Sequence, residues 1–259
     1  MKNIITTARR KIGDILSIQT HNDFHHYLLC NAIDRYKRSR DNEGLGLGRV
    51  VALCSNQQEA MAFSKYDFEE ILLTGINPPG DALLAAIDRD NRISYRRQNS
   101  ECLDIGSGTF DLVICKEGIH HLARPVLGVY EMLRITKSHI VIIEPANTLV
   151  NVLLMRLGLA SDYEKNLDCN INCRDNYVYR WSRDRLRDLL NSYYLESGYE
   201  LHIISGWMSG KLTAHKSKAV RVLSAFLGAI ASYIPGSPGN YMTAVIKSGA
   251  NLPPDAYAQ

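Results

Sequence analysis

The segment Phe110-Asp-Leu-Val-Ile-Cys-Lys-Glu-Gly-Ile-His-His-Leu122 is followed by Tyr130-Glu-Met-Leu-Arg134 and by Ile140-Val-Ile-Ile-Glu-Pro145. The first segment joins an apolar run to a polar turn, and the second has the spacing of a short helix. The third is another apolar run, which ends in Glu-Pro. A strand, a helix and a strand in this order form a βαβ unit, whose crossover connection makes the two strands parallel. The sequence therefore predicts a parallel sheet.

The same alternation continues on both sides of this unit. Strands are predicted over residues 49–53, 71–76, 93–97, 111–115, 139–143, 199–205 and 241–247, and helices over residues 59–66, 81–88, 148–157 and 183–193. Strands that alternate with helices are typical of an α/β fold with a mostly parallel sheet. We expect a doubly wound sheet of seven strands with helices on both faces.

The chain divides into three expected parts. Residues 1–48 have helical spacing and predict an N-terminal helical cap, in which the basic run 35–40 is interpreted as the solvated end of a helix. Residues 49–247 form the main domain, with an insertion over about residues 146–197, and residues 248–259 form a tail. An apolar helix is predicted over residues 219–234; it either packs on the sheet or, with the basic residues before it, docks on anionic lipid.

The composition limits the classes of function. The chain has 259 residues with 46% hydrophobic and 22% charged residues, and its net charge of +3 is too small to favour nucleic acid as a partner. Cys169 and Cys173 lack the companions of a zinc site, so no metal is predicted. The N-terminus lacks the apolar core of a signal peptide and no run spans a bilayer comfortably, so we expect a cytoplasmic protein with at most peripheral membrane contact.

The opening segments closely resemble the fourth and fifth strands of class I S-adenosylmethionine-dependent methyltransferases. The usual form in that family is FDLV, a short loop, LHHL, a helix with EMLR, and a strand that ends in EP. The resemblance implies a Rossmann-like fold that binds S-adenosylmethionine at the carboxyl ends of its strands. It also implies in-line methyl transfer to a small molecule or a biosynthetic intermediate.

The donor-binding motifs depart from the family pattern. The glycine motif after the first strand falls on Ala52–Gln58, where the acid and all three glycines are absent, and the acidic positions after the second and third strands fall on Asn77 and Asn99. Glycine-rich residues 44–48 and 103–109 are not followed by a helix in the right place and are interpreted as connecting loops. The resemblance assigns donor contacts to Leu53, Cys54, Ser55, Asn56, Asn77, Pro78, Asn99, Ser100, Cys115, Lys116 and Glu117.

Histidines after the fourth predicted strand are the candidates for acid-base chemistry. His120 and His121 lie at the expected donor end of the sheet, and histidine titrates near neutral pH, so either could accept a proton from the acceptor, with a marginal preference for His121. Packing or capping by these rings is the alternative.

The acceptor, which could be anionic, sugar-like or lipid-linked, is expected to meet the N-terminal helix and the insertion. The candidate residues are His21, His25, His26, Tyr27, Tyr177, Tyr179, Arg180 and Trp181, of which Tyr177 and Trp181 fit a packed core better. The alternative to an enzyme is a catalytically inactive relative that serves as a binding or partner subunit.

Overall fold

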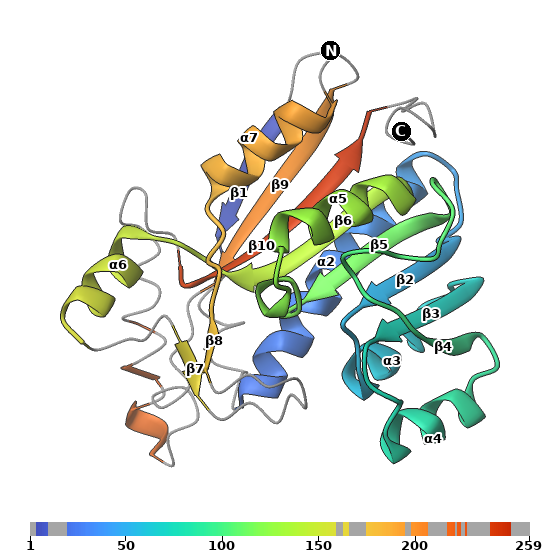
Figure 1. Ribbon diagram of the computed structural model, residues 1–259, viewed down its shortest axis with the longest axis horizontal. Helices are drawn as coiled ribbons and strands as arrows, with labels where there is room; N and C mark the ends of the chain where they lie inside the picture. Colours follow the sequence, from blue (N-terminus) through green and yellow to red (C-terminus); the bar gives the residue numbers. More distant parts are fainter. Residues whose placement is uncertain are drawn as a thin grey trace.

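The computed structural model describes residues 4–9, 20–158, 163–165, 175–194, 198–206, 217–220, 222–223, 226 and 239–249. Their central element is an eight-stranded sheet with the order β1-β9-β10-β6-β5-β2-β3-β4 (Figure 1). The strands are β1 (Ile4–Arg9), β2 (Arg49–Leu53), β3 (Glu70–Gly75), β4 (Ile93–Arg97), β5 (Phe110–Lys116), β6 (Thr136–Pro145), β9 (Tyr199–Gly206) and β10 (Tyr241–Ser248). Only β10 runs antiparallel to its neighbours, β6 and β9.

The helices lie on both faces of this sheet. They are α2 (His21–Asn42), α3 (Gln57–Phe63), α4 (Asp81–Arg89), α5 (Pro125–Ile135), α6 (Leu149–Arg156) and α7 (Arg183–Tyr194). The doubly wound, mostly parallel α/β fold predicted from the sequence is thereby confirmed. A short antiparallel pair, β7 (Tyr163–Lys165) and β8 (Asp175–Tyr177), lies within the predicted insertion and was not predicted.

Each face of the sheet has its own hydrophobic core. Alternate residues of β5 and β6 point to opposite faces: Val113 and Ile140 pack with α5 and α7, whereas Ile114 and Val141 pack with α2 and α3. Strands that are covered on both sides need apolar residues at consecutive positions, which explains the unbroken run in β5. The two layers of helices are visible in Figure 1, with α5 and α7 in front of the sheet and α2 behind it.

The N-terminal part differs from the expected helical cap. Helix α2 is present and packs against β6, β10 and α3. Residues Ile4–Arg9, however, form strand β1, which pairs in parallel with β9 and adds an eighth strand to the expected seven. A strand of six residues gains its hydrogen bonds from a partner distant in the chain, which local spacing does not reveal. The predicted domain boundaries stay predictions.

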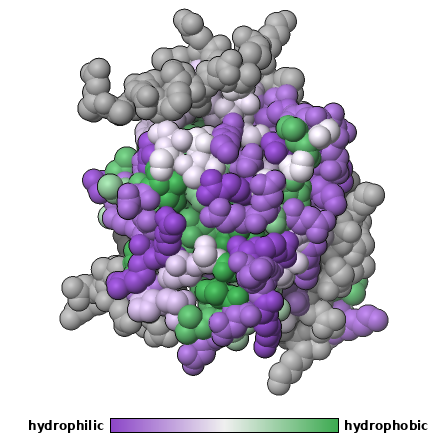
Figure 2. All heavy atoms as spheres, turned by 90° about the vertical axis from the view of Figure 1, so that its right-hand side faces the viewer, coloured by the Kyte–Doolittle hydropathy of each residue, from purple (hydrophilic) through white to green (hydrophobic). Residues whose placement is uncertain are grey.

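The other edge of the sheet is β4. Its side chains alternate between buried Ile93 and exposed polar residues, including Arg96. Charged residues on an exposed edge strand oppose pairing with another sheet. The face that carries this edge is mainly hydrophilic, with smaller hydrophobic areas between the polar side chains (Figure 2).

Several predicted features lie partly or wholly outside the described residues. These are Ile12, Ile15 and Leu16 of the cap, the Cys169–Cys173 pair, the tail beyond residue 249 and most of the apolar helix 219–234. In the described part of that helix Val222, Leu223 and Phe226 are exposed, so these three side chains are not buried on the sheet. No helix among the described residues has the length and hydropathy needed to cross a membrane.

Candidate functional site

A cavity of about 350 Å³ opens at the carboxyl ends of the central parallel strands. It is lined by Cys54, Ser55, Asn56 and Gln57 after β2, by Gly75, Ile76, Asn77, Pro78, Pro79, Gly80 and Leu83 after β3, by Tyr95 and Ser100 from β4 and its loop, and by His121 and Leu122 after β5. Crevices beyond the carboxyl ends of parallel strands are the usual ligand sites of open α/β sheets. The volume lies within the range of small-molecule pockets.

The loop after β2 keeps a glycine-like conformation without glycine. Cys54 has a φ of 52°, in the left-handed region. Its side chain fits because Gly118 lies directly opposite: a Cβ atom added at Gly118 would collide with Cys54 and come within 2.8 Å of Cys115 Sγ. The left-handed conformation of Cys54 costs about 1–2 kcal/mol, which the surrounding packing must offset.

Polar contacts hold the rest of this loop. Ser55 Oγ accepts a hydrogen bond of 3.0 Å from Thr74 N of β3, and Ser55 N donates to Thr74 O at 2.8 Å. Asn56 caps helix α3: its Oδ1 accepts from Gln58 N at 2.8 Å, and its own N donates to Glu59 Oε2 at 2.8 Å. The loop therefore has a defined strand-turn-helix shape despite its missing glycines.

Two thiols meet beneath this loop. Cys54 Sγ lies 3.3 Å from Ser100 Oγ. A hydrogen bond between Cys54 and Cys115 lowers the pKa of Cys54 and raises the pKa of Cys115, which is fully buried. Cys115 is therefore part of the core and does not line the cavity.

Asn77 follows β3 on the cavity rim. Its backbone carbonyl accepts a 2.5 Å hydrogen bond from Tyr95 Oη, which fixes the turn in which Asn77 lies, and its side chain is exposed. Tyr95 passes so close to Gly75 that a Cβ atom there would lie 2.7 Å from the hydroxyl oxygen. The turn after β3 thus presents the Asn77 amide to the cavity.

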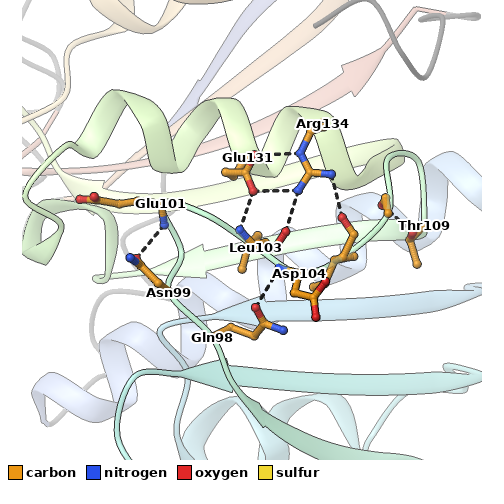
Figure 3. A network of polar contacts seen from close by, with 10 residues as sticks. Gln98, Asn99, Glu101, Leu103, Asp104, Thr109, Glu131 and Arg134 are labelled. Atoms are coloured by element: carbon orange, nitrogen blue, oxygen red, sulfur yellow. Dashed lines mark hydrogen bonds and ion pairs between the residues drawn. The ribbon is translucent and has the colours of Figure 1, made fainter. Parts of the chain in front are cut away.

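Asn99 is engaged elsewhere. Its Oδ1 accepts a hydrogen bond of 3.0 Å from Glu101 N, which is a local turn, and it is not among the residues that line the cavity (Figure 3). Its neighbour Ser100 lines the cavity instead. The same figure shows how α5 holds this loop through Glu131, which accepts a hydrogen bond of 2.7 Å from Leu103 N. Arg134 of the same helix also donates to Ile105 O at 2.7 Å.

The two histidines after β5 have different surroundings. His120 is buried, and its Nδ1 lies 2.5 Å from Oε2 of the fully buried Glu144 at the end of β6. The other oxygen of Glu144 accepts from Gly118 N at 2.9 Å and from Ile119 N at 2.8 Å. His121 is exposed and lines the cavity, with its ring centroid 4.2 Å from that of His120. Glu144 therefore shapes the loop that presents His121.

Lys116 and Glu117 point away from the cavity. Lys116 is buried and pairs with Glu59 of α3 at 3.1 Å. Glu117, which has a φ of 49°, lies 2.5 Å from His25 Nδ1 of α2 and accepts a 2.6 Å hydrogen bond from Tyr241 Oη. These pairs tie α2 and α3 to the strand ends beside the site.

The predicted acceptor residues are dispersed. His26 contacts Lys65 at 3.0 Å, and Tyr27 packs at the margin of the core. Trp181 is buried, as predicted, against Tyr179 at a ring distance of 5.1 Å, whereas Tyr177 is 54% exposed and the expectation that it is core was wrong. His21 begins α2, and Arg180 is half-buried.

Of the predicted site residues, the structure brings the following to one cavity: Cys54, Ser55, Asn56, Asn77, Pro78, Ser100 and His121. Leu53, Asn99, Cys115, Lys116, Glu117 and His120 do not line it. Sequence reasoning missed Tyr95, which reaches the cavity from within a strand, and Leu122, which completes the His-His-Leu segment. The position of Leu122 in that segment was a usable signal, whereas nothing in the sequence marks Tyr95.

Comparisons with known proteins agree with this geometry. A family model described as a methyltransferase domain matches residues 45–143. Magnesium protoporphyrin IX methyltransferase from Synechocystis PCC 6803 is 13% identical, with a TM-score of 0.52 over 87% of this chain and 84% of that one. YcgJ from Bacillus subtilis is 12% identical, with a TM-score of 0.51 over 84% of this chain and 98% of that one.

A third similar structure is the small RNA methyltransferase HEN1, which is 12% identical with a TM-score of 0.55 over 85% of this chain and 25% of that one. The comparison with curated proteins gave no match. At these identities the solved structures show only the fold. The family model covers the part of the chain whose residues line the cavity. Residues 45–143 therefore match the methyltransferase domain family, and the fold of the chain is similar to that of solved methyltransferases.

Proposed function

We propose that this chain transfers the methyl group of S-adenosylmethionine to a small-molecule acceptor at the cavity beside Asn77 and His121. The observation that carries the proposal is the cavity itself, which is open at the carboxyl ends of β2, β3 and β5 although the glycine motif is absent. A loop that filled this crevice with side chains would leave no space for the donor.

The residues present fit the donor. The amide of Asn77 is exposed at the end of β3, where the family places an acid for the ribose hydroxyls, and it offers both an acceptor and donors. The loop Cys54–Gln57 borders the same cavity and would hold the amino acid portion, while Ser100 and Leu122 would meet the base. When bound, S-adenosylmethionine supplies an electrophilic methyl group on a sulfonium.

The two histidines have separate roles in this proposal. His121, exposed at the cavity, accepts the proton of the acceptor at a ring nitrogen. His120 is a positioning residue: Glu144 fixes its ring, and the adjacent ring of His121 is thereby oriented. Holding donor and acceptor in attack geometry supplies the remaining rate enhancement.

A small acceptor is favoured over nucleic acid by charge and by size. The net charge of +3 gives little attraction to a phosphate backbone. HEN1, however, acts on small RNA and shares the fold, so RNA is the competing acceptor class. Incubation with methyl-labelled donor and either a panel of small metabolites or short RNA separates the two. Label in RNA alone would contradict the proposal.

Donor binding is measured by titration calorimetry with S-adenosylmethionine and with S-adenosylhomocysteine. Asn77→Ala should weaken both by about tenfold, because one or two hydrogen bonds to the ribose are lost. Asn77→Asp should tighten binding by about fivefold, since a charge-assisted bond replaces a neutral one. Asn91→Ala, which makes the same substitution at an exposed position away from the cavity, is the control.

The outcome also decides between an enzyme and an inactive relative. Absence of donor binding in the unmodified protein would favour the catalytically inactive partner subunit. His121→Gln should leave donor affinity within about twofold and abolish transfer to any acceptor that must lose a proton. Unchanged transfer would remove His121 from the mechanism while leaving the donor site in place.

A further inference from the structure

A second cavity, of about 360 Å³, lies at the opposite edge of the sheet from the donor pocket. Helix α2 forms one wall. The other wall is formed by the starts of β6 and β9 and by the end of β10, which runs antiparallel to both. None of its lining residues belongs to the donor cavity. It is therefore a separate site.

The helix wall of this cavity is polar. Arg35, Arg38, Ser39 and Asn42 are spaced at i, i+3, i+4 and i+7, which places them on one stripe of α2. The stripe belongs to the basic run that we expected to be solvated. Arg35 and Ser39 are instead half-buried against the sheet, whereas Lys37, on another side of the helix, is exposed.

The sheet wall is polar as well. His139, Lys247 and Glu200 are register partners across β6, β10 and β9, so their side chains stand in one row. His202 is two residues beyond Glu200 on the same face. His139 Nε2 lies 3.2 Å from Ser39 Oγ and links the sheet wall to the helix.

The cations of this cavity outnumber the anions. Arg35 donates to His202 Nδ1 at 2.8 Å, and neither Arg35 nor Arg38 forms an ion pair with a carboxylate in the part of the chain that the structure describes. Lys247 pairs with Glu43, and Glu200 lies 3.7 Å from His202 Nε2. Burial and the neighbouring Arg38 lower the pKa of Arg35, and burial and Arg35 lower the pKa of His202. The positive charges therefore repel one another across an open space.

We propose that this cavity binds the phosphoryl group of a small phosphorylated ligand. Arginine presents a planar set of donors that matches phosphate oxygens, and two arginines on one helix stripe can hold the same group. Ser39 and Asn42 add neutral donors beside them. A bound dianion would relieve the repulsion between Arg35 and Arg38, which no carboxylate of the described chain does.

The probe is inorganic phosphate, followed by pyrophosphate, titrated at low ionic strength and monitored by calorimetry and by the ring resonances of His202 and His139. The dissociation constant should be below about 1 mM. Arg38→Gln, at an exposed position that does not hold the fold together, should weaken binding about tenfold or more because a charge-assisted contact is lost. Arg35→Gln should have at least the same effect.

Lys37→Gln is the matched control, since it removes one positive charge from the same helix outside the cavity. It should change the affinity by less than about twofold. The proposal is overturned if phosphate does not bind, if chloride binds equally well, or if Lys37→Gln and Arg38→Gln have equal effects.

A short RNA that binds at this face far more tightly than pyrophosphate would also overturn the proposal, in favour of a nucleic-acid surface. S-adenosylmethionine should not compete with phosphate, and its affinity for the protein should be the same in these variants as in the unmodified protein. A failure of donor binding would therefore count against the proposed function and leave this inference standing.

Discussion

His139 should make the protein lose stability as the pH falls. Its ring is 2% exposed, and burial, with further contributions from Lys247 and Arg40, lowers its pKa from 6.5 to about 4. The other charged groups around it are Glu43, which acts in the opposite direction, and His202, Arg35, Arg38 and Glu200 of the same cavity. Because the unfolded chain binds the proton more readily, the free energy of unfolding rises with pH between about 4 and 6.5.

The magnitude follows from the difference between the two pKa values. A shift from 6.5 to about 4 corresponds to about 3 kcal/mol when the transition is complete. Between pH 7.5 and pH 5 this ring alone should lower the free energy of unfolding by about 2 kcal/mol. This is a substantial fraction of the 5–15 kcal/mol that typically stabilises a folded protein.

The assay is urea unfolding of the unmodified protein and of His139→Gln at pH 7.5 and at pH 5.0. The variant should be less stable than the unmodified protein at both pH values, because a packed ring is removed. Its free energy of unfolding should, however, fall by about 2 kcal/mol less between pH 7.5 and pH 5.0 than that of the unmodified protein. The ring resonance that is missing from the variant identifies His139 in the spectrum and gives its pKa directly. Equal losses in both proteins, or a titration of that resonance near 6.5, would refute the reasoning.

Two further substitutions test the loops around the donor cavity. Gly118→Ala should lower the free energy of unfolding by about 1–3 kcal/mol because the added methyl group collides with Cys54. The double variant Cys54→Gly with Gly118→Ala should recover much of this in urea unfolding, and a strictly additive loss would contradict the proposed contact. Glu144→Ala should cost about 3–5 kcal/mol, since two backbone amides and His120 lose a buried partner. A loss below about 1 kcal/mol in the same assay would show that the carboxylate does not organise the loop.

Much of the fold was predictable because its strands are buried on both faces. The predicted bounds of β2 and β4 agree with the structure, and those of the other main strands and helices differ by a few residues at most. The exceptions are informative. Strand β1 depends on β9, whose register partners lie 196 residues further along the chain. Strands β7 and β8 are each three residues long. None of these strands produces a local pattern that could be recognised.

The location of the site was predictable, because it follows from where the parallel strands end, but the directions of its side chains were not. Every parallel strand delivers its following loop to one edge, so Asn77, Ser100 and His121 could be placed together from the sequence. The direction of each side chain within a loop depends on local hydrogen bonds. Asn99 turns to Glu101 and Lys116 to Glu59, and no spacing rule distinguishes them from neighbours that face the cavity. Within the basic run of α2, Lys37 and Arg38 are exposed as expected, whereas Arg35 and Arg40 are half-buried, because a basic run at a helix end is usually solvated and its spacing does not show which side chains turn towards the sheet.

Pairing β1 with β9 has a consequence for how the protein is made. Ile4 lies opposite Glu200, so β1 has no neighbouring strand until about two hundred more residues have been translated. At usual elongation rates this wait lasts roughly 10–40 seconds. During that time the segment must remain available for pairing, and this edge of the sheet is completed only after β9 has been synthesised. Loss of the segment would leave the backbone of β9 open to pairing with another chain.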